Sequence, residues 1–399
     1  MMAPLDFTTF YNIINNQLAP TAATRHGINP ANSQPNLEVP VSTQTDVDNA
    51  VQAAREAFKI WSKTTFAERR AALAAYADAI EANADADAKT LTMEQGKPLA
   101  KSAIEVGMAS TWVRGKKTPI GVAGAIVPWN FPAVLAVGKT VPAVGDDALG
   151  PMITEHPGID KISFTGSILT GKRVMASCAK TLKQVTLELG GNDPAIICDD
   201  VDIDAVIPKV GILSYLCSSR ICMMIKRLYM HEKIYDVFLE KLIAFVKTLK
   251  VGDGIDPDVF VGPVQNKMQF EKARDLFRSI STDKLQAVLG GSIENSTGYF
   301  IHPTILDNPP ESSRVADVVE RANALETGLG ASAWSKDLER ATHIADQLQS
   351  GVVWVNSHFD VASNAPFGGH KQSGIGVEWG LTGLLGYCNS QTQWLKKSV

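Results

Sequence analysis

The sequence predicts an α/β protein with two domains, each built on a parallel sheet of the doubly wound kind. Short apolar runs at residues 121–127, 161–164 and 185–189 alternate with segments whose apolar residues recur at helical spacing. After Gly191 the same alternation begins again with the apolar run 195–198. Strands that alternate with helices are typical of a parallel sheet covered by helices, and this pattern is the basis of the predicted fold class.

The length of the chain limits the number of domains. With 399 residues, of which 45 % are hydrophobic and 20 % charged, the chain has ordinary globular composition and enough length for two or three domains. We expect a first domain over residues 1–190, a second over 191–376 and a C-terminal tail over 377–399.

The N-terminal part is predicted to be mainly helical. Thr45 is typical of an N-cap, and apolar residues at helical spacing follow it as far as Trp61. An Ala-rich helix is expected over 68–87 and another helix over 99–114.

The later elements are predicted from short apolar runs that are bounded by turn formers. The run 121–127 indicates a strand because Pro128 stops it, and a helix is expected over 131–144. The other expected elements are strands at 161–164, 185–189, 195–198 and 351–356, a helix that begins near Thr170 and a helix over 234–249.

Composition and charge exclude several classes of function. The net charge is −4 and there is no dense Lys/Arg block, so no nucleic-acid partner is expected. The five cysteines are odd in number and show no C-x-x-C spacing, which predicts neither a metal site nor a disulfide framework and fits a reducing, cytoplasmic setting. Residues 118–138 carry no charge, but three prolines would break a helix there, so a strand and turn are expected rather than a membrane span.

Cys222 is the candidate nucleophile. Free cysteine usually packs as a small apolar group, and that alternative stays open on the sequence alone. Two features favour a reactive thiol: Arg220 lies two residues away, and the run 213–224 is expected to start a helix whose dipole would stabilise a thiolate.

Glu188 and Asn130 are the other groups suited to covalent thiol chemistry. Glu188 lies near the carboxyl end of a predicted strand, where sites form in doubly wound sheets, and its carboxylate can take a proton. Asn130 stands in the run Pro128–Pro132 and can donate an amide hydrogen bond to an oxyanion. A solvated glutamate and a simple turn residue are the alternatives.

Residues 164–172 contain a glycine-rich turn between a predicted strand and helix. They match G-x-x-x-x-G-K, but the next residue is Arg173 instead of the Ser or Thr that holds Mg²⁺, which disfavours a triphosphatase. Backbone N–H groups at the start of the following helix can still meet the phosphates of a dinucleotide. A second glycine-rich loop, 366–376, is expected to fold over the site, whereas His358 and His370 are expected to be packing or surface residues.

Taken together, these motifs resemble the aldehyde dehydrogenase family. Single motifs are weak, but six of them in family order are strong, and residues 45–110 and 230–262 are also similar. The matching runs are 128–132, 164–167, 187–191, 221–222, 351–356 and 366–376.

The resemblance implies an enzyme that oxidises an aldehyde to a carboxylic acid through a cysteine thiohemiacetal and thioester. Cys222 would attack the aldehyde, Asn130 and the backbone N–H of Cys222 would hold the oxyanion, and Glu188 would activate water. Lys139 matches a lysine that helps proton movement near the cofactor, and Phe367 matches an aromatic residue of the substrate tunnel.

The resemblance also implies a cofactor, NAD or NADP, bound by the first domain, with the catalytic thiol in the second. The tail would be an oligomerisation segment. The residues that match cofactor-binding positions are Pro128, Trp129, Lys139, Thr165, Gly166, Ser167, Leu189 and Gly190.

The chain departs from the family pattern at three apparent losses, located at 115–119, 142–146 and 314–317. The second and third remove residues that hold the two cofactor riboses, so weakened cofactor binding is expected. The first removes part of the strands used in assembly, although a homo-oligomer stays open. These losses motivate an alternative in which the chain is a catalytically impaired relative that acts as a binding subunit, or the product of a decayed or mis-predicted gene.

The neighbourhood of the thiol differs as well. Ser219 and Arg220 stand where the family has Gly-Gln. Glycine commonly serves positions with positive φ, so Ser219 would be strained there by about 1 kcal/mol.

Overall fold

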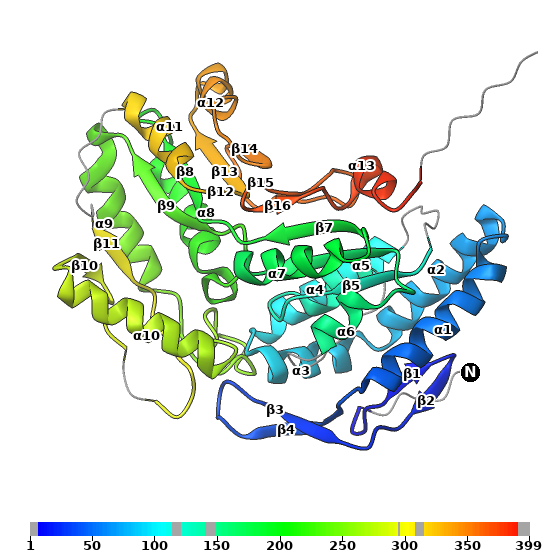
Figure 1. Cartoon of the computed structure of the whole chain (residues 1–399). Helices are drawn as coiled ribbons and strands as arrows, with labels where there is room; N and C mark the ends of the chain where they lie inside the picture. The colour runs from blue at the N-terminus through cyan, green and yellow to red at the C-terminus, as the bar shows by residue number, and fades with distance from the viewer. Residues whose placement is uncertain (1–6, 114–120, 140–148, 294–295, 308–314, 390–399) are drawn as a thin grey trace, which may run out of the picture.

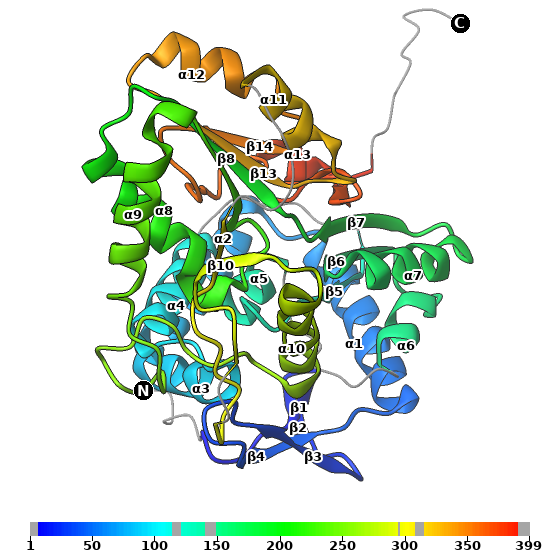
Figure 2. The same cartoon turned by 90° about the vertical axis from the view of Figure 1, so that its left-hand side faces the viewer.

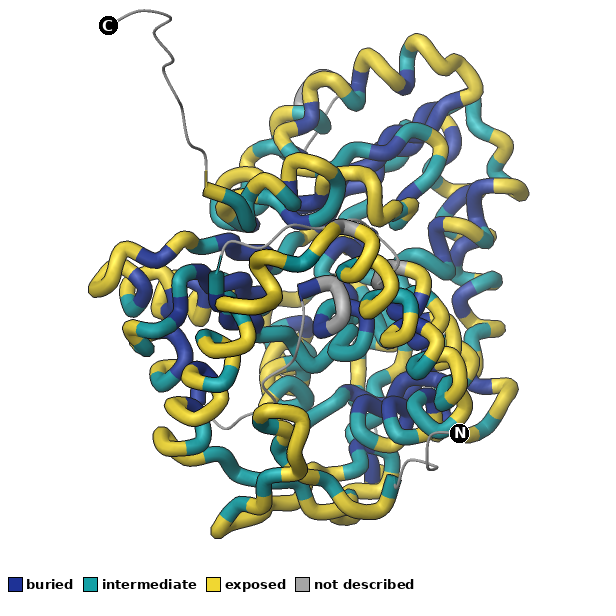
Figure 3. Tube along the Cα trace, turned by 90° about the vertical axis from the view of Figure 1, so that its right-hand side faces the viewer, coloured by how far each residue is buried: buried dark blue, intermediate teal, exposed yellow. Residues whose placement is uncertain are grey.

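The computed structural model describes residues 7–113, 121–139, 149–293, 296–307 and 315–389. Two four-stranded sheets lie at its centre, and helices cover them (Figure 1). In Figure 3 most of the dark blue, buried segments lie inside the molecule, while the outer turns of the helices are yellow and exposed. This arrangement confirms the predicted α/β class.

The first sheet has the order β16-β7-β6-β5. Strands β5 (Ala123–Ile126), β6 (Lys161–Gly166) and β7 (Gln184–Leu189) are parallel, and the short β16 (Gly374–Ile375) pairs antiparallel with β7. The three parallel strands correspond to the apolar runs in the sequence. They are buried because apolar side chains of neighbouring helices pack on the sheet.

The second sheet has the order β14-β13-β8-β9, and all of its strands are parallel. It contains β8 (Asp193–Ile197), β9 (Ile225–Met230), β13 (Gly330–Trp334) and β14 (Val352–Val355). The chain passes from the first sheet to the second between β7 and β8, and β16 returns to the first sheet. The domain boundaries at 190 and 376 stay a prediction.

Helices pack on both faces of the second sheet (Figure 2). Side chains alternate between the faces of a strand, so neighbouring residues of β8 enter different cores. Ile197 packs with helices α8 (Ile203–Tyr215) and α9 (Tyr235–Val246), whereas Ile196 packs with Ala322 of α11 (Val315–Ala324) and Ile344 of α12 (Leu338–Ala345).

The helices of the N-terminal part differ from the prediction in two details. Helix α1 (Gln44–Trp61) is capped by Thr43 instead of Thr45, since the Thr43 side chain accepts the backbone N–H of Asp46. The predicted single helix over 68–87 is two helices, α2 (Phe66–Ala82) and α3 (Ala84–Gln95), because the chain turns at Asn83.

Helices α4 (Leu99–Val113) and α5 (Pro132–Lys139) pack against each other next to the first sheet. The uncharged stretch 118–138 therefore contains β5, a turn and most of α5, as expected. Within the described ranges the helices are all too short or too polar to cross a membrane. The first two apparent losses, at 115–119 and 142–146, lie outside the described residues, within 114–120 and 140–148. The third, at 314–317, begins at the last residue of the range 308–314, which is not described, and extends into the start of α11.

The remaining elements surround the two sheets. Strands β1 with β2 and β3 with β4 form antiparallel pairs at the lower edge of Figure 1. The bounds are β1 Asn12–Ile14, β2 Gln17–Ala19, β3 Thr24–Ile28, β4 Pro35–Pro40, α6 Leu149–Glu155, α7 Ile168–Ala179, α10 Lys267–Thr282, β10 Gln286–Leu289, β11 Ile305–Asp307, β12 Thr327–Gly328, β15 His370–Lys371 and α13 Gly380–Leu385.

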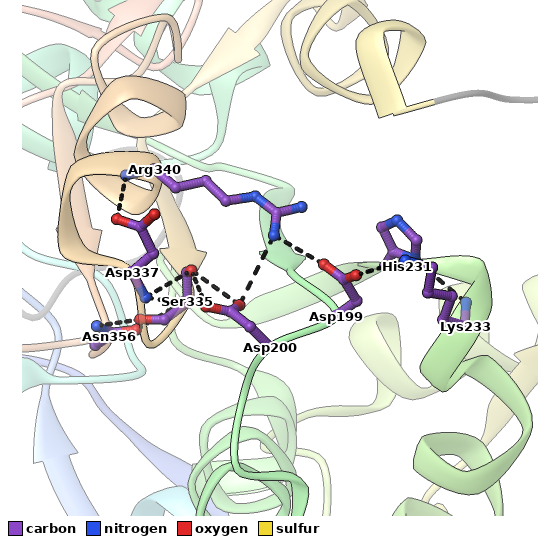
Figure 4. A network of polar contacts seen from close by, with 8 residues as sticks. All are labelled: Asp199, Asp200, His231, Lys233, Ser335, Asp337, Arg340 and Asn356. Atoms are coloured by element: carbon purple, nitrogen blue, oxygen red, sulfur yellow. Dashed lines mark hydrogen bonds and ion pairs between the residues drawn. The ribbon is translucent and has the colours of Figure 1, made fainter.

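A polar network closes the carboxyl edge of the second sheet (Figure 4). Asp199, just after β8, accepts hydrogen bonds from Arg340 at 2.8 Å and Lys233 at 3.2 Å. Asp200 accepts from the Ser335 hydroxyl at 2.7 Å. These bonds tie the ends of β8 and β13 to helix α12 and to the segment after β9.

Candidate active site

A cavity of about 240 Å³ lies where the first sheet meets the segment before β9. Its walls also include apolar side chains that the sequence did not single out, among them Phe131, Leu135, Ile221, Met223, Phe359 and Trp379. The site residues expected from the sequence that line it are Pro128, Trp129, Asn130, Thr165, Gly166, Ser167, Glu188, Leu189, Cys222 and Phe367.

The topology explains why these residues meet. Asn130 follows β5, Gly166 ends β6, and Glu188 lies at the end of β7, so three neighbouring parallel strands point their carboxyl ends at the same place. Cys222 comes from the second sheet, just before β9. Lys139 and Gly190 are not in the wall of the cavity: Lys139 is buried behind it, and the carbonyl of Gly190 accepts a hydrogen bond from Ser373.

The predicted helix over 213–224 is wrong. Helix α8 ends at Tyr215, and a short 3₁₀ turn over Leu216–Ser219 follows. Residues 217–219 have φ of +50°, +56° and +57°, which reverses the chain before Cys222. The thiol therefore gains no stabilisation from a helix dipole. The expectation of a positive φ at Ser219 is confirmed.

Arg220 does not serve the thiol as expected. Its guanidinium donates to the carbonyl oxygens of Cys217 at 3.0 Å and Gln95 at 3.2 Å and stacks over the ring of Trp129. The cation is thus directed toward backbone carbonyls and an aromatic face.

The environment of Cys222 favours the neutral thiol. Burial, together with the negative charges of Glu188 and Asp193, raises the pKa of the Cys222 thiol to about 12. At neutral pH the sulfur is therefore protonated, and its reactivity depends on a group that can take the proton.

Glu188 has the properties of that group. Its side chain is buried, and burial and the nearby Glu378 raise its pKa to about 7, against the opposing effect of Lys139. Oε2 accepts a hydrogen bond from Thr165 at 3.2 Å. Oε1 is buried and has no hydrogen-bond partner in the part of the chain that the structure describes, so it can accept a proton from a new donor.

Lys139 links Glu188 to a second buried carboxylate that the sequence reasoning missed. Its Nζ lies 2.9 Å from Oε1 of Glu378, 2.6 Å from the Ser163 hydroxyl and 3.9 Å from Oε2 of Glu188. Burial opposes ionisation of Glu378. The charge of Lys139 and the hydrogen bond that Glu378 accepts from the Ser163 hydroxyl outweigh it, and together they lower the pKa of this carboxyl.

Glu378 reaches the site through a backbone bridge. It exchanges two hydrogen bonds with Phe367, at 2.8 and 2.7 Å, so the chain after the glycine-rich loop folds back along the cavity. The ring of Phe367 in turn packs against Trp379, with ring centres 5.0 Å apart. One sequence signal could have identified Glu378: it is a charged residue that stands two positions after the glycine-rich loop 366–376.

Asn130 is held in place on both sides. Its Nδ2 donates to the carbonyl of Arg220 at 2.8 Å, and its own carbonyl accepts from Lys97 at 2.8 Å. One N–H group of a carboxamide remains after the bond to Arg220. Asn130 therefore fixes the segment before Cys222 and still has a donor to offer.

The residues around the start of α7 fit the phosphates of a dinucleotide. Ser167 caps this helix by accepting the N–H of Thr170, and the next N–H groups of a first helical turn have no partner within the helix. Thr165, Gly166 and Ser167 form the adjoining wall of the cavity. A helix N-terminus of this kind is suited to anionic groups.

Comparison with known proteins places the chain in a family. The model described as "Aldehyde dehydrogenase family" matches residues 19–115, 111–146 and 144–393. These segments join where the first two losses were expected. Aldehyde dehydrogenase LUC3 from Fusarium sp. is 34 % identical over 466 positions, which cover 98 % of this chain and 100 % of LUC3. Because the chain has only 399 residues, LUC3 contains segments that this chain lacks.

Two further similarities agree with that match. Succinate-semialdehyde dehydrogenase [NADP(+)] GabD from Escherichia coli K12 is 30 % identical, over 90 % of this chain and 92 % of GabD. A crystal structure of betaine aldehyde dehydrogenase from Staphylococcus aureus in complex with NAD+ superimposes with a TM-score of 0.89 and 27 % identity, over 94 % of this chain and 92 % of that one. The chain belongs to the aldehyde dehydrogenase family.

Proposed function

We propose that the protein oxidises an aldehyde to a carboxylic acid with NAD or NADP, through a covalent intermediate on Cys222. The observation that carries the proposal is the meeting of Cys222, Glu188 and Asn130 in one cavity, with a buried carboxylate oxygen of Glu188 left without a partner. A homologous enzyme whose name includes NADP, and a solved relative that holds NAD+, support the choice of cofactor.

Each residue has a role that its surroundings support. Glu188 takes the proton of the Cys222 thiol, and the sulfur forms a bond to the aldehyde carbon, giving a thiohemiacetal. The developing oxyanion accepts hydrogen bonds from the remaining amide N–H of Asn130 and the backbone N–H of Cys222. NAD(P), when bound, accepts the hydride that the aldehyde carbon gives up.

Release of the product uses the same carboxylate. Glu188 first gives the thiol proton to solvent and so returns to its ionised form. It then takes a proton from the water that attacks the thioester carbon. The carbon–sulfur bond breaks, the acid leaves, and Glu188 gives this second proton to the sulfur. Lys139 and Glu378 set the charge around Glu188. The first turn of α7, with Thr165, Gly166 and Ser167, would hold the phosphates of the cofactor, and Pro128 and Trp129 would contact its other parts.

The test measures the absorbance of reduced cofactor with purified protein, NAD or NADP, and a panel of aldehydes. We expect turnover that Cys222→Ser abolishes and that Glu188→Gln lowers by about 10²-fold or more. Cys388→Ser, at a half-buried cysteine in the C-terminal part, is the matched control. A folded protein that reduces neither cofactor with any aldehyde would exclude the proposal.

Weakened cofactor binding and impaired catalysis are separate proposals. None of the relatives described above supports them, and they rest on the residues missing at the two ribose positions. Calorimetric titration with NAD and NADP tests them, because a dissociation constant in the range of active relatives would remove their basis.

The cellular location and the oligomeric state of the protein are also proposals. The free state of all five cysteines supports a reducing, cytoplasmic location, which cell fractionation would test. A homo-oligomer, with the tail 377–399 contributing to assembly, is tested by sedimentation of the full chain.

A further inference from the structure

We propose that His358 is a positioning residue for the nucleophile and that it acts by fixing the turn that carries Cys222 through the carbonyl of Met223. This inference rests on the proposed function, because it assigns His358 a role toward the reacting sulfur. It also changes the expectation from the sequence, in which His358 was a packing or surface residue.

Cys222 stands in a tight turn that is weakly closed by its own backbone. The N–H of Met224 donates to the carbonyl of Ile221, so Cys222 and Met223 are the two central residues. That bond is 3.4 Å long, beyond the usual 2.7–3.2 Å range for N–H···O bonds. The conformation of the turn therefore depends on contacts from other elements.

Two such contacts flank the sulfur, and both are 2.8 Å long. Asn130, after β5, donates to the carbonyl of Arg220 on one side of Cys222. On the other side His358, after β14, donates from Nε2 to the carbonyl of Met223. The two side chains come from different sheets, so the turn is fixed relative to both halves of the site.

The hydrogen-bond pattern assigns the tautomer of His358. The carbonyl of Met223 can only accept, so Nε2 of His358, 2.8 Å away, carries the ring proton. Nδ1 of the neutral ring is then an acceptor, and the Ser332 hydroxyl donates to it at 3.0 Å. The Ser332 oxygen in turn accepts the indole N–H of Trp334 at 3.0 Å, which holds the hydroxyl in place.

The ring is fixed by its surroundings as well. His358 is 3 % exposed and packs against the ring of Trp354, with centres 4.6 Å apart. Burial lowers the pKa of His358 to about 4, so the ring stays neutral at physiological pH and keeps this tautomer. Asp193, whose carboxyl lies 3.9 Å from Nε2, is itself buried, and burial raises its pKa.

Two substitutions of His358 distinguish the effect of its N–H donor from the effect of its ring packing against Trp354. His358→Phe keeps a ring beside Trp354 and removes the N–H, whereas His358→Gln places an amide N–H near the position of Nε2. Phe238→Leu, in the buried core of the second sheet away from the cavity, is the control for a simple loss of stability.

The readouts are kcat, KM and the pH dependence of alkylation of Cys222 by iodoacetamide, measured on the Cys222 peptide by mass spectrometry. The alkylation profile reports on the thiol and the charged groups that face it, namely Glu188, Asp193 and Lys226. It requires no turnover, so it still tests the inference if the proposed oxidation is absent.

We expect His358→Phe to lower kcat by about tenfold or more with little change in KM, because a small displacement of the sulfur is costly. Its alkylation midpoint should move by about half a pH unit or more. His358→Gln should stay within about threefold of the wild type in kcat. If His358→Phe fails to fold, Ser332→Ala, which frees the ring to take the other tautomer, should move the alkylation profile in its place.

Two results would overturn the inference. One is a His358→Phe protein with the kcat and alkylation profile of the wild type and only the loss of melting temperature that Phe238→Leu also shows. The other is equal impairment by His358→Phe and His358→Gln, since the N–H would then be irrelevant.

Discussion

Glu188 and Glu378 face the same ammonium group. Nζ of Lys139 lies 3.9 Å from a carboxylate oxygen of Glu188 and 2.9 Å from one of Glu378, and all three side chains are buried. Beyond the effect of burial, Lys139 lowers the pKa of Glu188 and Glu378 raises it, and the result is a value of about 7. The charge balance of this trio sets the pH at which Glu188 can act as a base.

Removing either neighbour should shift the pH profile, and the two shifts should have opposite signs. Activity of the wild type should rise with pH through about 7, as Glu188 loses its proton. In Lys139→Gln the midpoint should move up by about one unit because a favourable cation is lost, and in Glu378→Gln it should move down because a repelling anion is lost.

The measurement is kcat/KM against pH for the three proteins. Because both substitutions remove one charge from the same buried cluster, each is the control for the other. A shift of both midpoints in the same direction would show that Glu188 does not determine the profile.

The sequence was sufficient for the parallel strands β5, β6, β7, β8 and β14 and for the residues at their ends, but it did not predict β9 and β13 of the second sheet. The apolar run that contains Glu188 is short and is followed by Gly190 and Gly191, so both the strand and the position of its carboxylate follow from local pattern. The start of α7 was predicted less closely: the Gly-Ser turn indicated a helix that begins near Thr170, whereas α7 begins at Ile168 with Ser167 as its N-cap.

The partners of these residues were not predictable, because they depend on contacts between distant segments. Glu378 stands 190 residues after Glu188, and no periodicity links the two. Arg220 was expected to serve Cys222 since it is close in sequence, but three consecutive left-handed residues before it turn the guanidinium toward Gln95 and Cys217. Sequence distance does not fix side-chain direction in a turn.

Those left-handed residues give a stability prediction at Ser219, whose φ is +57°. Ser219→Gly and Ser219→Ala both remove the hydroxyl that accepts a bond from Lys226 at 2.9 Å, so their comparison isolates the backbone. We expect the glycine variant to be more stable by about 1 kcal/mol, measured by urea unfolding. An alanine variant of equal or greater stability would contradict a left-handed conformation at this position.

The network at the carboxyl edge of the second sheet should contribute stability that depends on pH. Hydrogen bonds from Arg340 and Lys233 lower the pKa of Asp199 below its unfolded value. The ionised carboxylate therefore stabilises the folded protein above about pH 4, and this contribution is lost as the pH falls toward the folded pKa.

Asp199→Asn should lower the melting temperature at pH 7, and the difference from the wild type should shrink on acidification. Asp204→Asn is the matched control, because Asp204 pairs with Lys241 and is largely exposed, and such pairs add little. Equal effects of the two substitutions, or an effect of Asp199→Asn that persists in acid, would argue against this account. Scanning calorimetry at several pH values provides the comparison.

Phe367 should influence which aldehydes enter the cavity. Its ring is 5 % exposed and packs against Trp379, so Phe367→Ala would enlarge the cavity next to the sulfur. We expect kcat/KM for small aliphatic aldehydes to fall by about tenfold, and bulky aromatic aldehydes to be affected less. Phe270→Ala, which removes a ring on α10 outside the cavity, should leave kcat/KM unchanged for both kinds of aldehyde.

The backbone bridge between Phe367 and Glu378 has a consequence for how the protein is made. The strands of both sheets leave the ribosome before residue 378 does, and until Glu378 emerges Lys139 lacks its closest carboxylate. A nascent chain can therefore hold every strand of both sheets while the charge environment of Glu188 is still incomplete. A protein truncated before Glu378 would keep Cys222 and Glu188 and lose the carboxylate whose charge raises the pKa of Glu188.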